Sequence, residues 1–333
     1  MGDQQQAIQC VGTSFYLCLA AIMFACLFGT GDPVRLLILR RAYLLAALIA
    51  TAAGYIDFFH LMPGSDRFLF NERVSATFKD PNVYGPFLIF PLLMLMTALM
   101  SRGIRILNLA LAAFLLGGLF LSFSRGAWMH FAVSAAVAVA ILVAVTPNPR
   151  LRARIVLFAA IAVVGTALLV AALMSVDTVR DLFKAIRPYD VGPGGRFWEQ
   201  RLALDVILDH PNGMDPFEFS RAFGMQQHDV YMQGFLVYGW LGGAAYLTLV
   251  AVTLAVGLAT VRVPAPWQNY LIVDYATFVG ARRSRSLSSI PTTGRHFFLL
   301  LGLIWGLAVA TINLRRRDAW MPGTASADGL PGA

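Results

Sequence analysis

Arginines stand out in the polar connectors that join the long apolar runs of this 333-residue chain. One connector, 62–82, contains the motif R-x-S-A-T-F-x-D-P-N from Arg73 onward, with Lys79 as a further cation. A shorter connector reads S-R-G and places Arg125 between two strongly apolar runs. The planar guanidinium is always charged and matches the oxygens of a phosphate. These residue types therefore predict a site for a phosphate-bearing substrate.

Both motifs also have a purely structural interpretation. In the first, Asn82 suits the N-cap of the helix that follows, and Pro81 after Asp80 keeps the chain extended before it. In the second, Arg125 would anchor a tight turn by reaching toward the membrane interface, and Gly126 permits close backbone approach. The functional interpretation is an anion site at a helix N-terminus. The sequence alone leaves both interpretations open.

A third connector, 175–231, is longer than a structureless loop usually is unless it has a function. After two glycines it continues as R-F-W-E-Q-R-L-A-L, with apolar side chains at four-residue spacing. This spacing predicts a helix on the membrane surface with Trp198 at the interface. Arg196 would stand at the start of this helix and Arg201 more than one turn later.

His228 lies near the end of the same connector, just before a new apolar run. Histidine is the side chain whose ordinary pKa best suits proton transfer near neutrality. A loop histidine is more often a solvated surface residue, and His210 competes for a catalytic role. His210, Pro211 and Gly213, however, fit a helix stop followed by a turn. His228 is therefore the candidate catalytic base.

The composition excludes most classes of soluble protein. Apolar residues make up 58% and charged residues 13% of the chain, whereas soluble domains carry about twice that share of charge. The mean hydropathy is +0.67, and the apolar runs are long enough to cross a bilayer. A disordered chain, a coiled coil, a disulfide-rich secreted domain and an ordinary cytosolic enzyme are therefore excluded. The chain is expected to be a polytopic inner-type membrane protein.

Several cofactor and partner classes are not expected either. The three cysteines lie eight residues apart without a CxxC or Cys/His pattern, so neither a disulfide framework nor a zinc site is indicated. No P-loop, HExxH, GxSxG or paired-carboxylate cluster occurs. The net charge of +8 comes from arginines in short connectors, where they set membrane orientation rather than bind nucleic acid. We therefore expect chemistry without a metal or a cofactor.

Runs of about 20 apolar residues predict an all-α fold, a polytopic membrane helix bundle of about nine spans that forms one membrane domain over 1–333. The candidate spans are 11–29, 42–61, 83–100, 106–122, 126–146, 155–174, 232–261, 265–281 and 296–313. The eighth is the weakest, because Asp274 interrupts it. The seventh is too long for one straight span, and Gly239, Gly242 and Gly243 are expected to mark a turn within it.

Arginines follow the odd-numbered spans, and the positive-inside rule places these connectors on the cytoplasmic side. The connectors 62–82, 123–125 and 175–231 then face the outside, and the large external loop 175–231 is expected to carry the interfacial helices. The N-terminus is also expected outside, as it would be if an odd number of leading helices were missing. The Arg/Ser-rich stretch 281–295 breaks this charge pattern.

Taken together, these motifs resemble those of the O-antigen ligase and O-antigen polymerase superfamily. The carrying motifs are R-x-S-A-T-F-x-D-P-N at 73–82, S-R-G at 124–126, G-G-R-F-W-E-Q-R-L-A-L and D-H-P-N-G-M-D within 194–215, and H-D-V-Y-M-Q-G-F-L-V-Y-G-W-L-G-G at 228–243. Their order and their expected placement on outer loops match the family over roughly 70–313. Each motif alone would be weak, whereas the set is specific.

The resemblance implies a glycosyltransferase that takes a glycan from undecaprenyl pyrophosphate without a metal or a nucleotide. It implies that Arg73, Arg125 and Arg196 contact the pyrophosphate or the donor sugar, and Arg201 and Lys79 are further candidates for this binding. His228 would activate the acceptor hydroxyl. Departure of the pyrophosphate needs no acid when arginines stabilise it. The acceptor is a lipid, a protein or a growing glycan, so ligase and polymerase both remain open.

Three features depart from the family pattern. Asp229 follows the histidine where an asparagine is usual, fewer spans are present, and the stretch 281–295 is atypical. Two alternative functions stay open beside the transferase. A polysaccharide or lipid transporter would use the spans and the outer arginines, but it needs polar residues along a path through the membrane, which the first six spans lack. A nonfunctional truncated paralogue would explain the departures.

Overall fold

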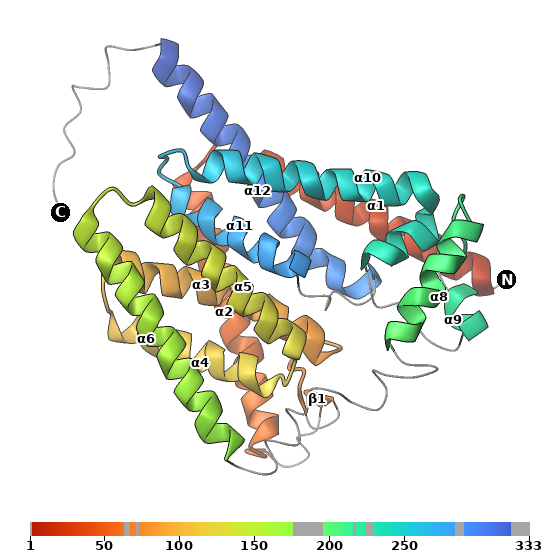
Figure 1. Cartoon of the computed structure of the whole chain (residues 1–333), viewed down its shortest axis with the longest axis horizontal. Helices are drawn as coiled ribbons and strands as arrows, with labels where there is room; N and C mark the ends of the chain where they lie inside the picture. The colour runs from red at the N-terminus through yellow and green to blue at the C-terminus, as the bar shows by residue number, and fades with distance from the viewer. Residues whose placement is uncertain are drawn as a thin grey trace.

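The computed structural model describes residues 2–62, 67–70, 73–175, 196–215, 218–223, 230–283 and 290–320. Most of these residues are helical, which confirms the all-α expectation (Figure 1). In chain order the helices are α1 (Gly2–Phe28), α2 (Pro33–Phe58), α3 (Pro81–Arg102), α4 (Ile106–Leu121), α5 (Arg125–Val145), α6 (Pro149–Met174), α8 (Arg196–Asp209), α9 (Glu218–Phe223), α10 (Val230–Val261), α11 (Gln268–Arg283) and α12 (Ile290–Trp320). Two short strands, β1 (Leu69–Phe70) and β2 (Arg73–Val74), pair antiparallel between α2 and α3.

Seven of the described helices, α1, α2, α3, α5, α6, α10 and α12, are long and apolar enough to cross a membrane. The chain is therefore a membrane protein by the length and composition of its helices. The other two expected spans form α4 and α11, which have 16 residues each. At about 1.5 Å per residue they reach about 24 Å, less than the ~30 Å hydrocarbon core. All nine apolar runs thus form helices, but two of them are too short for a full perpendicular span.

The degree of burial separates central from peripheral helices. In the apolar stretch of α3 that is long enough to cross a membrane, 78% of the residues are buried. In the corresponding stretch of α6, 6% are buried. α3 packs against α2, α4, α5, α6 and α11, whereas α6 lies at the edge of the bundle (Figure 1). α11 is also almost wholly buried, because α3, α5, α10 and α12 pack around it. This burial by neighbouring helices explains how a short helix with a charged residue fits the bundle.

α1 and α12 cross at two glycines of α12 that lie four residues apart. A Cβ on Gly302 would lie 2.5 Å from the Ala21 carbonyl oxygen, and one on Gly306 would lie 2.7 Å from that of Ala25. Small residues at this spacing allow helix backbones to approach closely in a membrane. The first and the last of the described helices are thereby packed against each other.

The bundle has an arginine-rich end, defined here by Arg102, Arg154 and Arg262. The α5–α6 and α10–α11 turns lie at one end of the bundle, whereas the start of α1, α8 and α9 lie at the opposite end (Figure 1). Arg102 ends α3, Arg154 is near the start of α6, and Arg262 follows α10. Arg102, Arg154 and Arg262, which follow the third, fifth and seventh predicted spans, therefore lie at the same end of the bundle.

α10 changes direction at Gly239, where φ is 66° and ψ is −171°. The expected turn within the long apolar run is therefore found at the first of the three glycines. A positive φ of this kind favours glycine, because a Cβ would crowd the backbone. The part after the kink, 240–261, is long enough to cross a bilayer by itself.

Candidate functional site

The β1–β2 hairpin holds Arg73 beside α2. Its register pairs Phe70 with Arg73 and Leu69 with Val74. Val74 is fully buried, and a Cβ on Gly54 of α2 would lie 2.4 Å from the Val74 Cγ1 atom. A glycine at position 54 is therefore needed to make room for Val74. Because Val74 is seated on α2, the adjacent Arg73 has a fixed position.

Asp57, near the end of α2, fastens the chain that leads into this hairpin. Its Oδ2 atom accepts a hydrogen bond of 2.6 Å from the Phe68 N–H, and the carboxylate is buried. The Phe68 carbonyl in turn accepts from the N–H groups of Ser75 and Ala76, at 3.0 Å each. A buried acidic residue thus has a structural role here, because its hydrogen bond orders the connector around Arg73.

Hydrogen bonds join the first two sequence motifs at Asn82. Arg73 Nη2 donates to Asn82 Oδ1 at 3.3 Å, and Ser124 Oγ donates to the same oxygen at 2.8 Å. Arg73 Nε donates to the Ser122 carbonyl at 3.0 Å. Residues from two distant connectors therefore meet in one place. We call Arg73, Asn82, Ser122 and Ser124 the Arg73 cluster.

The N-cap of α3 is Asp80, and the sequence-based assignment of the cap to Asn82 is wrong. Asp80 has extended backbone angles, φ −149° and ψ 138°, and its Oδ1 atom accepts from the Asn82 N–H at 2.6 Å. Pro81 occupies the first helical position, where its missing N–H costs nothing and its fixed φ fits. Because Asp80 provides the cap, the side chain of Asn82 can accept from Arg73 and Ser124.

α5 begins at the same place, with Ser124 as its N-cap. Ser124 Oγ accepts from the Ala127 N–H at 3.3 Å while it donates to Asn82. α3 approaches closely, since a Cβ on Gly85 would lie 2.5 Å from the Ala127 Cβ. The N-termini of α3 and α5 therefore lie side by side. Both direct the positive end of a helix dipole toward the Arg73 cluster.

Two non-glycine residues beside the cluster have left-handed backbone angles, with φ 49° at Ala76 and 44° at Phe123. Such conformations cost about 1–3 kcal/mol each and concentrate at functional sites. Phe123 lies between Ser122 and Ser124, so its turn allows both serines to contribute to the cluster. Neither residue type favours a left-handed conformation, so the local sequence does not predict it at these positions.

The cations around the cluster give it a positive character. Lys79 is exposed and immediately precedes the α3 cap. Arg125 is the first residue of α5 and is exposed, with Gly126 after it. Lys79 and Arg125 are thus the chain neighbours of the two N-caps, so that positive charge gathers where Arg73 and two helix N-termini meet, which suits an anion with several oxygens. Asp80 belongs to the same motif, and its carboxylate is engaged in capping α3.

The third motif lies on α8, apart from the Arg73 cluster (Figure 1). α8 packs against α10, with Ala203 and Ile207 buried in a small apolar core that includes Leu236. Arg196 is the first residue of α8, and Arg201 is exposed on its surface. The described structure therefore places the predicted binding residues in two groups rather than one.

The turn after α8 is docked onto the kink in α10. His210 Nδ1 lies 2.9 Å from the Val206 carbonyl, one turn back in α8. The backbone N–H of Trp240 donates to the Pro211 carbonyl at 2.9 Å. Gly213 has a φ of 82°, and a Cβ there would lie 2.7 Å from the backbone of α10. These contacts give His210, Pro211 and Gly213 a structural role.

His228, the predicted catalytic base, and its neighbour Asp229 lie outside the described residues. The next described residue is Val230, the first residue of α10. α10 begins at the end of the bundle where α8 and α9 lie (Figure 1).

Four polar side chains that the sequence did not single out as a group lie among the helices. Tyr43 of α2, His130 of α5 and Asp274 of α11 are buried, and His296 of α12 is half-buried with a buried Nε2 atom. The Tyr43 hydroxyl lies 2.5 Å from His296 Nδ1, and His130 Nε2 lies 2.9 Å from the Thr277 carbonyl. Within the described part of the chain, both Asp274 oxygens are buried without a hydrogen-bond partner. Only the charge of Asp274 within an apolar run signalled this feature.

Among the described residues, no three His, Cys, Asp or Glu side chains are grouped in a way that could hold a metal ion. Comparison with protein families, characterised proteins and solved structures finds no match for this chain. The function is therefore argued from the geometry of the site and the motifs that form it.

Proposed function

We propose that this chain is a glycosyltransferase that moves a glycan from undecaprenyl pyrophosphate to a hydroxyl acceptor on the outer face of the bacterial inner membrane. The observation that carries the proposal is the junction of two motifs at Asn82, which receives hydrogen bonds from Arg73 and Ser124. Those same motifs resemble the O-antigen ligase and polymerase superfamily. The arginines and the paired helix N-termini supply what a pyrophosphate needs.

The positive charge at this site acts on the leaving group. In the reaction the acceptor oxygen forms a bond to the anomeric carbon, and the bond from that carbon to the pyrophosphate oxygen breaks. Undecaprenyl pyrophosphate leaves with the bonding electron pair. Arg73 and Arg125 stabilise the negative charge that develops there, so no general acid is required. His228 takes the proton of the acceptor hydroxyl.

The direct test is transfer of a labelled glycan by the purified full-length chain in liposomes. Donor linked to undecaprenyl pyrophosphate is supplied with EDTA, and loss of donor is compared with that in liposomes without protein. We expect turnover in EDTA, because arginines rather than a metal stabilise the leaving group. A ladder of products would identify a polymerase, and one shifted acceptor would identify a ligase. Absence of turnover by well-inserted protein would contradict the proposal.

Asp274 favours a second candidate function, a proton-coupled transporter of the same lipid-linked glycans. A carboxylate at this depth without a hydrogen-bond partner in the described chain is costly, and such residues often belong to proton pathways. The sequence counted against a transporter because the first six predicted spans lack such residues. Asp274, in the eighth predicted span, is a residue of this kind.

The substitution Asp274→Asn separates the two functions, because it removes the charge with little change of shape. We expect the variant to keep glycan transfer within about twofold of the native rate, since none of the hydrogen bonds that form the Arg73 cluster involves Asp274. The measurement is donor turnover beside transbilayer movement of the same labelled donor under a pH gradient. Movement by the native chain that stops in the variant would instead establish transport.

A further inference from the structure

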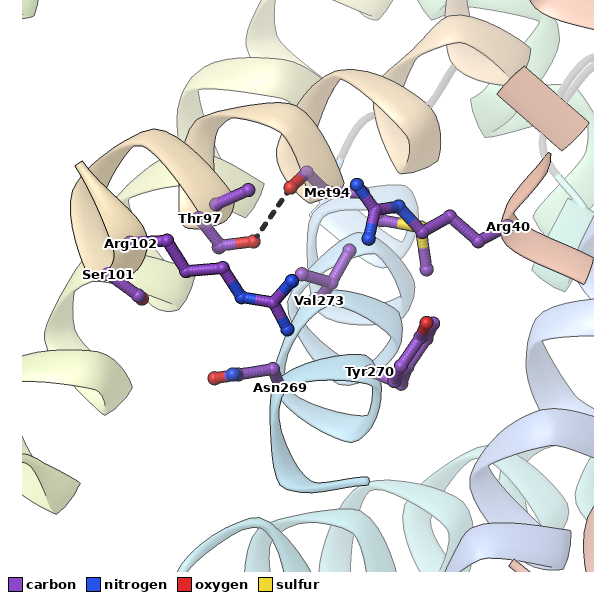
Figure 2. A pocket seen from close by; sticks show the side chains of 9 residues that line it. Arg40, Met94, Thr97, Ser101, Arg102, Asn269, Tyr270 and Val273 are labelled. Atoms are coloured by element: carbon purple, nitrogen blue, oxygen red, sulfur yellow. Dashed lines mark hydrogen bonds between the residues drawn. The ribbon is translucent and has the colours of Figure 1, made fainter. Parts of the chain in front are cut away.

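A hollow at the arginine-rich end is lined by arginines from two different helices (Figure 2). Arg40 comes from α2, and Arg102 is the last residue of α3. Asn269 and Tyr270, in the first turn of α11, line the same hollow. Figure 2 shows both guanidinium groups directed into the space beside α11. Charge from α2 and α3 thus converges on one place.

This hollow is remote from the Arg73 cluster. Asn82 is the second residue of α3 and Arg102 is its last. At about 1.5 Å per residue, the two lie about 30 Å apart along the helix, which is about the thickness of a hydrocarbon core. The hollow therefore belongs to the opposite membrane interface and is a separate site from the proposed donor site.

The two positive charges in the hollow have no counter-charge in the described part of the chain. No hydrogen bond or ion pair is made there by Arg40 or Arg102, whereas Arg35 on the same helix pairs with Asp32 at 3.4 Å. Two guanidinium groups that face one hollow repel each other. A bound anion would convert this repulsion into attraction.

Arginines at a helix C-terminus often serve only to satisfy its last carbonyl groups. Here another arginine already does so. Arg154 of α6 donates to the Met100 carbonyl at 3.0 Å and to the Ser101 carbonyl at 2.5 Å. The end of α3 therefore does not require the guanidinium of Arg102 for capping, nor that of Arg40.

We propose that this hollow binds the phosphate group of an anionic phospholipid from the leaflet at the arginine-rich end. The arginine forks match phosphate oxygens, and the amide of Asn269 and the hydroxyl of Tyr270 add neutral hydrogen-bonding groups. Basic pockets between membrane helices recognise phospholipid head groups in this way. Met94 and Val273 line the same hollow and offer apolar contact to the glycerol and the first acyl carbons.

The test is lipid binding by the full-length chain in uncharged detergent, followed by native mass spectrometry and thermal unfolding. Phosphatidylglycerol is titrated beside phosphatidylcholine with the same acyl chains. We expect phosphatidylglycerol to bind more tightly and to raise the unfolding temperature. Arg40→Gln and Arg102→Gln should each weaken this binding about tenfold, because each removes charge-assisted hydrogen bonds. Arg41→Gln, at an exposed neighbour that does not line the hollow, is the matched control.

Three results would overturn the proposal. The first is equal binding of phosphatidylcholine, and the second is an equal loss of affinity in Arg41→Gln, which would indicate general attraction to a basic surface. The third is binding of glycerol phosphate or inorganic phosphate as tight as that of phosphatidylglycerol, which would assign the hollow to a soluble phosphate. Unfolding temperatures of the lipid-free variants report whether each is folded.

Discussion

Replacing Arg73 by alanine is expected to lower the rate of glycan transfer by a factor on the order of 10²–10³, the usual effect of removing one donor that stabilises charge in a transition state. Arg73 is the residue whose hydrogen bonds reach both the Ser122 carbonyl and Asn82 Oδ1. Its loss removes a positive charge from the leaving pyrophosphate and one of the two hydrogen-bonded links between the motifs, the other being Ser124 to Asn82. The readout is the initial rate of donor loss in liposomes.

The conservative variant Arg73→Lys distinguishes charge from geometry. Lysine keeps the charge, but its single ammonium group cannot reproduce the arrangement in which Nε and Nη2 bond to different acceptors. We therefore expect about a tenfold recovery over the alanine variant, still below the native rate. Arg67→Ala is the matched control, because Arg67 is an exposed arginine of the same connector. Equal losses at Arg67 and Arg73 would show that the connector acts only through its overall charge.

The helices were predictable because the signals that define them are local. The apolar run 83–100 forms Pro81–Arg102, and the run 126–146 forms Arg125–Val145. In both cases a proline or a serine marks the start, as local capping chemistry requires. α2 was less predictable, since it begins at Pro33 rather than at 42. Its first turns carry arginines whose aliphatic stems tolerate the membrane interface.

The interactions within the site depend on contacts between distant parts of the chain, and these were less accessible. The residue types at 73 and 82 indicated a site. The sequence could not show, however, that Arg73 and Ser124 both donate to the Asn82 side chain, which leaves Asp80 as the cap. The convergence of Arg40 and Arg102 has no sequence signature, because it depends on how α2 and α3 are aligned. For the same reason, the pairing of Tyr43 with a histidine of α12 could not be read from either run.

Replacing His228 by alanine is expected to reduce transfer by a factor on the order of 10²–10⁴, the range that a positioned general base contributes. The acceptor hydroxyl is a poor nucleophile until a base takes its proton, and the Arg73 cluster offers one cation and neutral groups rather than a base. The rate is measured at saturating donor and varied acceptor, so that loss of acceptor activation appears in kcat. Membrane insertion is checked for every variant.

His210 provides the matched control for this experiment. It is an exposed histidine whose Nδ1 lies 2.9 Å from the Val206 carbonyl at the end of α8. His210→Ala should therefore leave kcat within about twofold and lower only the stability of the α8 turn, by about 1 kcal/mol. Asp229→Asn, which restores the residue usual in the resembling family, should also remain active. Equal losses in His210→Ala and His228→Ala would contradict the assignment of His228 as the base.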